Sequence, residues 1–341
     1  MKRCLLLVLP LFALAVPATA GATTFGAEVG SDFTHQVPGA WSQARVMSNL
    51  NALYKAGGRV ARADSDWAHA EPKAPVRGRH TYEWSYDDLI VSELASARLR
   101  WEPTLAFAPR WAEEQVSNVI HTSTGRWIAY LPPASNATFA AYATAFMQRY
   151  GPQGAFWKAN PKLPYVPVGT VEVWNEPDNL FDWGQHINLS DYARMYEAVR
   201  TAVHRVDRSA LVMTGGLAWT ESSLPRLLKA FRGLRIDALG IHPYGATPGQ
   251  TIAVARVALA DMRAYGRGGT PVSANEYGWT TIRHTWGSTN PKYVKSYAYT
   301  ALVGLAKLPL FEIEPFSWAD PSWGLSTGSF AEAVATITHR S

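Results

Sequence analysis

The sequence predicts an α/β protein, a single-domain (β/α)8 or TIM barrel. Eight short apolar runs, each ending in polar or aromatic residues, recur along the chain, and amphipathic stretches separate most of them. Residues 21–341 have a length that one α/β barrel fills, and no linker or low-complexity tract divides them. Strand followed by helix, eight times over, is typical of parallel strands joined by right-handed crossovers.

The predicted strands are rich in Val, Ile, Leu and Ala. Short apolar runs bounded by polar residues are typical of buried strands. In chain order the strands lie in residues 24–30, 59–67, 100–109, 170–176, 210–216, 238–244, 271–279 and 311–320.

Helices are predicted between these strands, and the clearest span residues 42–57, 86–99, 137–151, 190–206 and 291–308. Ser190 is predicted to cap the N-terminus of one helix, and Gly57 is predicted to end another. The alternative fold, a doubly wound open sheet, would favour a Gly-rich phosphate loop after the first strand, and none follows it. After the third strand, residues 113–136 form the longest irregular segment, which we expect to shape one wall of a cleft.

Residues 1–20 have the pattern of a secretory signal peptide. Two basic residues precede an apolar run, and the segment ends in Ala18-Thr19-Ala20. We therefore expect a secreted protein, extracellular or periplasmic, whose mature domain spans residues 21–341. Cys4 is the one cysteine and lies in this leader, so the exported domain would depend on its packed core rather than on disulfides.

The composition argues against nucleic acid as a partner and favours a sugar. The net charge is +5, but no run of Lys and Arg concentrates it. The chain has 14 Trp and 15 Tyr, flat amphipathic rings that suit ligands with apolar faces and polar rims, as sugars have. We expect an oligosaccharide or polysaccharide partner, no membrane span and a monomeric protein.

Reactive side chains gather where predicted strands end. A barrel brings these ends to one mouth, so Glu176, after the fourth strand, and Glu276, after the seventh, should face each other. Two facing carboxyls can divide the roles of acid and nucleophile, which is the chemistry of glycoside hydrolysis. The other candidates at strand ends are Arg62, Asn175, His242, Tyr244 and Trp318.

Several motifs resemble those of one enzyme clan. The stretches "VWNEP" on the fourth strand and "ANEYGW" on the seventh resemble the acid/base and nucleophile strands of retaining clan A (β/α)8 glycoside hydrolases. "IHPY" on the sixth strand and Trp318 on the eighth strengthen the resemblance, and residues 57–72, 82–90 and 104–112 are most similar to family 39-like and family 5-like, cellulase-type members. The resemblance covers the whole chain after the leader and implies an O-glycosyl hydrolase.

The resemblance also implies residue roles. Glu176 would be the acid/base and Glu276 the nucleophile that forms a covalent glycosyl-enzyme, while Asn175 would bind the sugar 2-hydroxyl. Arg62 and Tyr244 would hold the nucleophile. Trp318 would be a sugar platform at the subsite of the cleaved residue. His242 has no spaced His or Cys companions, so we expect it to bind the sugar or Glu276 rather than a metal, and no cofactor is implied.

Two electrostatic expectations follow. Desolvation and a neighbouring carboxylate should raise the pKa of Glu176, so that it holds a proton. Glu172, four residues earlier in an alternating strand, should point the same way but deeper, where a buried pair with an arginine is expected rather than catalysis.

Three alternatives stay open to different degrees. An arabinofuranosidase of the same clan would use the same two glutamates. A non-catalytic carbohydrate-binding or assembly barrel is a second class, but degenerate members of this kind usually lose a glutamate or the neighbouring Asn, and all three are present. An esterase or amidase would favour a Ser or Cys nucleophile, and the chain has neither a GxSxG motif nor a cysteine after the leader.

Overall fold

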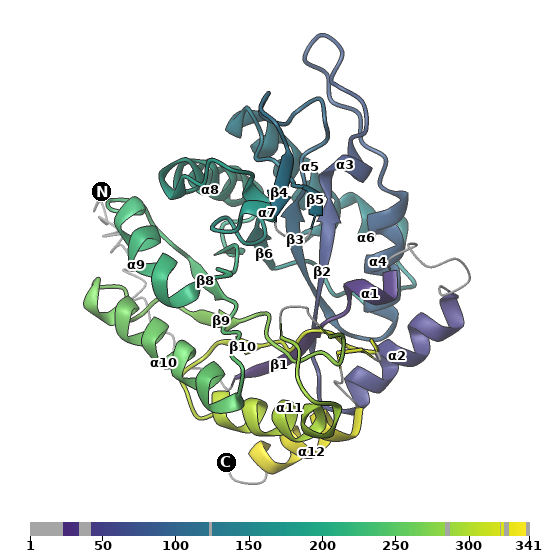
Figure 1. Cartoon of the computed structure of the whole chain (residues 1–341). Coiled ribbons are helices and arrows are strands. Elements are labelled where there is room, and N and C mark those ends of the chain that lie inside the picture. The colour runs from purple at the N-terminus through teal and green to yellow at the C-terminus, as the bar shows by residue number, and fades with distance from the viewer. Residues whose placement is uncertain are drawn as a thin grey trace, which may run out of the picture.

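The chain folds into a closed barrel of eight parallel strands wrapped by helices (Figure 1). The computed structural model describes residues 23–33, 42–122, 125–283, 287–320, 322–323 and 327–338. The predicted signal peptide lies outside these residues. Among the described residues, no helix combines the length and the hydropathy needed to cross a bilayer.

The barrel strands follow the order β1-β10-β9-β8-β7-β6-β3-β2, and the ring closes where β2 pairs with β1. Closure excludes the open-sheet alternative. Each of the eight predicted strands contains one barrel strand. Their bounds are β1 Thr24–Glu28, β2 Val60–Asp66, β3 Arg100–Ala106, β6 Thr170–Val173, β7 Leu211–Thr214, β8 Ala238–Ile241, β9 Val272–Ala274 and β10 Glu312–Ile313.

Helices cover the outside of the barrel and confirm the five clearest helix predictions. Those five are α2 (Gln43–Lys55), α4 (Ser85–Ser96), α5 (Asn136–Tyr150), α8 (Leu189–Val206) and α11 (Pro291–Leu305). The other described helices are α1 (Gly30–Phe33), α3 (Trp67–Ala70), α6 (Ala155–Ala159), α7 (Leu180–Trp183), α9 (Thr220–Ala230), α10 (Pro248–Ala264) and α12 (Thr327–Thr338).

Two local predictions have different outcomes. Gly57 follows the end of α2 with φ +103°, a left-handed backbone that glycine adopts without strain, so the predicted helix end is confirmed. The predicted cap at Ser190 is wrong: Asn188 caps α8, and its side chain accepts a hydrogen bond from the Ser190 N–H.

The segment predicted as irregular contains a second, small sheet. Strands β4 (Val119–Thr122) and β5 (Gly125–Ile128) pair antiparallel within residues 113–136, outside the barrel. This segment leaves the barrel after β3, at the carboxyl ends of the strands, where active sites of such barrels lie.

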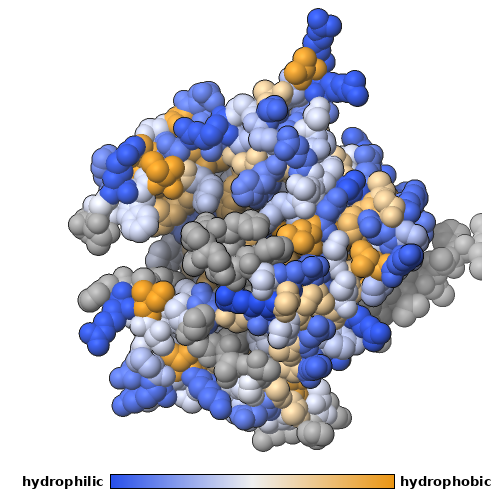
Figure 2. Space-filling model, turned by 90° about the vertical axis from the view of Figure 1, so that its right-hand side faces the viewer, coloured by the Kyte–Doolittle hydropathy of each residue, from blue (hydrophilic) through white to orange (hydrophobic). Residues whose placement is uncertain are grey.

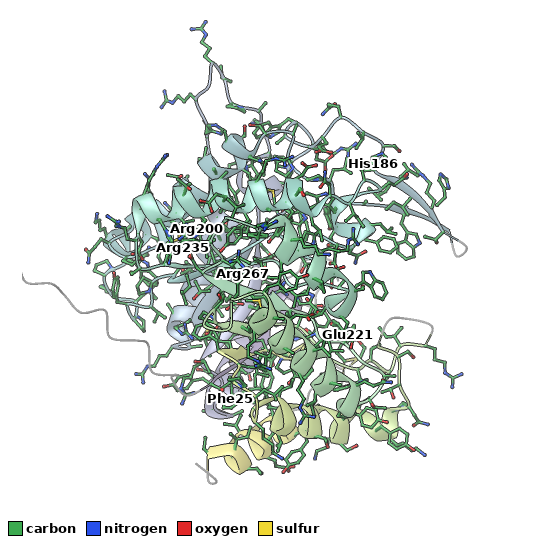
Figure 3. The ribbon with its side chains drawn as sticks, turned by 90° about the vertical axis from the view of Figure 1, so that its left-hand side faces the viewer. Phe25, His186, Arg200, Glu221, Arg235 and Arg267 are labelled. Carbon is green, nitrogen blue, oxygen red and sulfur yellow. The ribbon has the colours of Figure 1, made fainter. Side chains whose placement is uncertain are left out.

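The two ends of the barrel are distinct in the figures. Figure 3 shows His186 and Glu221, in the connections that follow β6 and β7, toward one side, and Arg235 and Arg267, in the connections that lead into β8 and β9, toward the other. The side with His186 and Glu221 faces the viewer in Figure 1. In Figure 2, which views the molecule from the right of Figure 1, this side lies at the left, and the outline is notched there. The carboxyl ends of the strands therefore lie at a hollowed face.

Candidate active site

A sharp turn after β6 presents the first glutamate. Trp174 (φ 68°) and Glu176 (φ 40°) both adopt left-handed backbone, which costs about 1–3 kcal/mol for each non-glycine residue. The Trp174 indole N–H donates to the Asp182 carbonyl oxygen at 2.6 Å and so anchors the turn. Pro177 follows directly and prevents the strand from continuing. Strained backbone of this kind is concentrated at functional sites.

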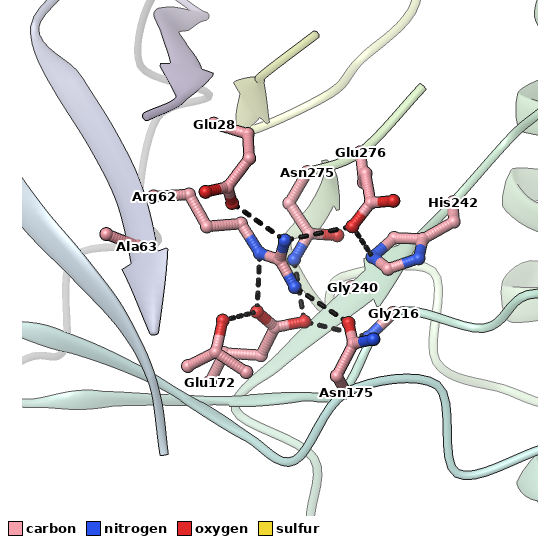
Figure 4. Close-up of polar contacts among 12 residues, drawn as sticks. Glu28, Arg62, Ala63, Glu172, Asn175, Gly216, Gly240, His242, Asn275 and Glu276 are labelled. Atoms are coloured by element: carbon pink, nitrogen blue, oxygen red, sulfur yellow. Dashed lines mark hydrogen bonds and ion pairs between the residues drawn. The ribbon is translucent and has the colours of Figure 1, made fainter. Parts of the chain in front are cut away.

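The second glutamate, Glu276, follows β9 and is held by two donors. Arg62 Nη1 donates to Glu276 Oε2 at 3.0 Å (Figure 4). The Tyr244 hydroxyl donates to Glu276 Oε1 at 2.8 Å. The side chains of Glu176 and Glu276 each keep 14% of their surface exposed. One oxygen from each of them and one nitrogen of His242 all lie within 4.8 Å of one another. The predicted meeting of the two glutamates is thus confirmed in space.

Arg62 connects the strands beneath the mouth. Its guanidinium donates to Glu172 Oε2 at 2.7 Å, Glu28 Oε2 at 2.9 Å and Asn175 Oδ1 at 3.0 Å, in addition to Glu276. The residue is 2% exposed, so its charge is balanced by these carboxylates rather than by water. The buried pair with Glu172 was predicted, and it is confirmed.

One ring nitrogen of His242 lies near each of the two glutamates. Its Nδ1 lies 2.8 Å from Glu176 Oε1, and its Nε2 lies 3.7 Å from Glu276 Oε2. A Cβ at Gly216 would overlap the imidazole, so glycine is required there. Burial lowers the pKa of His242, but the two carboxylates outweigh it and the net shift is upward.

The expected upward shift in the pKa of Glu176 is wrong. Burial raises its pKa, as expected. The hydrogen bond and charge of His242, with the hydrogen bond from Asn179 Nδ2 at 2.6 Å, outweigh burial, and the net pKa lies below its ordinary value. The sequence predicts a carboxylate beside Glu176, whereas an amide and an imidazole contact it directly, Asn179 Nδ2 at 2.6 Å and His242 Nδ1 at 2.8 Å. The charge and hydrogen bond of His242 thus favour the ionised form of Glu176, and Glu176 in turn favours the protonated form of His242.

The structure does not bring Trp318 to this site. Its side chain is 2% exposed, its indole N–H donates to the Asn49 carbonyl oxygen of α2 at 2.9 Å, and its ring packs against Phe330 of α12. A sugar platform needs an open ring face, so the predicted role of Trp318 is corrected. The ring next to Tyr244 belongs to Trp323, at a centroid distance of 6.4 Å.

Three polar residues of the site were not predicted: Glu28, Asn179 and Asn275. Glu28 ends β1 and was visible as a carboxylate at a strand end. Asn275 stands next to Glu276 and donates to Glu172 Oε1 at 2.8 Å. Asn179 lies beyond the strand, in the turn after Glu176, and no strand-end pattern marks it.

Among the described residues, two groups of three lie close enough to ligate a cation, Glu176-His242-Glu276 and Glu102-Glu312-Glu314.

No family model and no curated protein sequence matches the chain. Solved structures do match its fold. A GH39 enzyme from Xanthomonas axonopodis pv. citri gives a TM-score of 0.66 at 16% identity, covering 92% of this chain and 66% of that one. A GH39 beta-xylosidase from Caulobacter crescentus gives 0.65 at 17% identity, covering 92% and 70%. The structure titled ZgEngAGH5_4 wild type gives 0.62 at 13% identity, covering 92% and 96%.

The chain thus spans slightly less than two thirds of the length of the first of these proteins. The predicted resemblance in fold to family 39 and family 5 glycoside hydrolases is confirmed. At these identities the likeness concerns the barrel itself.

Proposed function

We propose that the protein is a secreted retaining glycoside hydrolase that cleaves β-linked glycans or glycosides by double displacement. The observation that carries this proposal is the pair of glutamates at the barrel mouth, with an oxygen of each within 4.8 Å of the other. Retaining enzymes hold their carboxyls about 5–5.5 Å apart, whereas inverting enzymes leave about 6.5–9.5 Å for a water molecule. The barrel likeness to GH39 and GH5 structures, one of them titled a beta-xylosidase, supports the same chemistry.

In the first step, Glu276 attacks the anomeric carbon and forms a glycosyl ester as the glycosidic bond breaks. The leaving oxygen takes a proton from Glu176, whose carboxyl lies 2.8 Å from His242 Nδ1. In the second step, Glu176 removes a proton from water, and the water oxygen displaces Glu276. Both residues return to their starting state.

The other polar residues would position substrate and nucleophile. Two hydrogen bonds fix the side-chain amide of Asn175: its Oδ1 accepts from Arg62, and its Nδ2 donates to Asp182 Oδ1 at 3.3 Å. From this position it would hydrogen-bond the sugar 2-hydroxyl. Arg62 and Tyr244 would keep Glu276 aligned, and the negative charge that returns to Glu276 in the second step would stay paired.

The test is hydrolysis of a broad panel of glycans and aryl glycosides by the purified protein. Replacing Glu176 by Ala is expected to lower kcat/KM by about 10²–10⁴-fold, the usual contribution of a general acid. Replacing Glu276 by Ala is expected to abolish the covalent route. Glu221→Ala, an exposed change on α9, is the matched control.

Product stereochemistry tests the retaining mechanism separately. NMR spectra recorded early in the reaction should show the β-anomer first. Initial release of the α-anomer would contradict the double displacement. Glycan binding without hydrolysis, unaffected by either glutamate variant, would instead favour a non-catalytic barrel.

A further inference from the structure

A pocket of about 590 Å³ lies between the barrel and the β4–β5 hairpin, and residues at and beyond the carboxyl ends of β2 and β3 line it. The barrel contributes Asp66 at the end of β2 and Phe107 directly after β3. The hairpin side contributes Arg126, Ile128 and Tyr130. A pocket of this size is in the range of small-molecule sites, about 300–1,000 Å³.

Ring contacts connect this pocket to the catalytic turn. Tyr130 stacks on Phe107 with ring centroids 3.9 Å apart, and Phe107 packs edge-on against Trp174 at 5.8 Å. Trp174 immediately precedes Asn175 and Glu176. The Tyr130 N–H also donates to the Phe181 carbonyl oxygen at 2.9 Å, which ties the hairpin segment to α7, the helix after Glu176. Ring contacts through Phe107 therefore connect the pocket lining to the turn that carries Glu176.

The surface around the pocket has the mixed character that sugars require. Tyr130 is 48% exposed and Trp127 is 51% exposed, with Trp127 edge-on to the half-exposed Phe181 at 5.9 Å. Six of the 13 large hydrophobic residues that the described chain exposes lie here, namely Val116, Trp127, Ile128, Tyr130, Leu180 and Phe181. Charged and polar groups line the same pocket, among them Arg110, Glu113 and Asn118. Ring faces beside hydrogen-bonding groups match the apolar faces and hydroxyl rims of a sugar.

We propose that this pocket is a subsite for an additional sugar unit, so that the enzyme acts on oligosaccharides or polysaccharides in preference to simple glycosides. The inference rests on the proposed glycosidase activity. Tyr130 is the stacking surface next to the cleaved bond, and Trp127 extends it outward. The β4–β5 hairpin is then a specificity element carried by a barrel whose catalytic residues come from other strands.

The experiment compares kcat/KM on an aryl monoglycoside with kcat/KM on a series of oligosaccharides of the same sugar. For the parent, kcat/KM should rise with chain length. Tyr130→Ala should lower the ratio of long-chain to monoglycoside kcat/KM by about 10-fold, the scale of one lost apolar contact in a pocket. Arg126→Ala, a second change in the lining, should lower the same ratio. Tyr265→Ala is the control, because Tyr265 is 38% exposed and follows α10 at the opposite end of the barrel.

An unchanged ratio in both lining variants would overturn the subsite. If the parent hydrolyses nothing, the proposed activity fails, and calorimetric titration of oligosaccharides into the Glu276→Ala protein decides the pocket independently. Binding that Tyr130→Ala weakens about 10-fold would support the subsite. Absence of binding, or binding that Tyr130→Ala leaves unchanged, would refute it.

Discussion

Glu172 is the residue on which the geometry of the mouth depends most. Four donors converge on its fully buried carboxylate: Arg62 Nε and Thr104 Oγ1 at 2.7 Å, Asn275 Nδ2 at 2.8 Å and the Gly216 N–H at 2.9 Å. Burial raises the pKa of Glu172, but Arg62, His242 and these hydrogen bonds outweigh it, and the pKa lies below its ordinary value. One carboxylate thus fixes Arg62, which in turn aligns Glu276 and Asn175.

Replacing Glu172 by Gln should therefore destabilise the protein by about 3–5 kcal/mol near neutral pH. Arg62 would lose a buried carboxylate partner, and the NH2 group of the new amide would face hydrogen-bond donors instead of acceptors. Because the folded pKa is depressed, this stabilisation is present above the unfolded pKa of about 4.3 and is lost as the pH falls further. Urea denaturation measures the change, with Glu221→Gln as an exposed control. A loss below about 1 kcal/mol would mean that Glu28 and Glu276 suffice to hold Arg62.

At the scale of elements, α8 shows how a helix positions the catalytic strand. Tyr192 donates to the Val173 carbonyl oxygen at the end of β6, at 2.9 Å, and Tyr196 donates to the Val212 carbonyl oxygen of β7 at 2.6 Å. The start of α8 therefore influences the turn that carries Glu176. Asn188 and Ser190 are both good N-cap residue types, and the structure selects Asn188.

Replacing Asn188 by Ala should lower the free energy of unfolding by about 0.5–2 kcal/mol, the usual effect of losing a cap. Ser190→Ala is the matched control and should change it by less than about 0.5 kcal/mol, since surface changes are small when they break no cap. Thermal denaturation of the two variants checks this. A larger loss of stability for Ser190→Ala than for Asn188→Ala would instead support Ser190 as the N-cap of α8.

At the scale of the whole molecule, the barrel interior is unusually acidic. Glu102 of β3 and Glu314, directly after β10, lie with Glu312 in one group whose oxygens are within 4.8 Å of one another. Strands β3 and β10 are separated in the sheet by β1 and β2, so these side chains meet across the interior. Glu102 and Glu314 are buried, and burial together with the neighbouring carboxylates raises the pKa of each well above its ordinary value.

This interior predicts a stability that falls as the pH rises. Above about pH 4.3 the unfolded chain releases protons that folded Glu102 and Glu314 retain, so each group lowers the free energy of unfolding by up to about 1.4 kcal/mol per pH unit until its folded pKa is reached. Glu102→Gln and Glu314→Gln should each flatten the decline between about pH 5 and pH 7, measured by chemical denaturation at several pH values. Variants with the same slope as the parent would show that these carboxyls are ionised in the folded protein.

The sequence by itself determined the strand positions, five of the longer helices and the two glutamates, because apolar runs of strand length and amphipathic stretches of helix length report local burial along the chain. It also placed Arg62, Asn175, His242 and Tyr244 at the correct end, since barrel closure puts strand ends at one mouth. Only the tertiary structure decided what meets across the barrel or between layers. The inward burial of Trp318, the contact between His242 and Glu176, and the pocket beneath the β4–β5 hairpin depend on contacts between residues far apart in the chain. No local pattern encodes such distances.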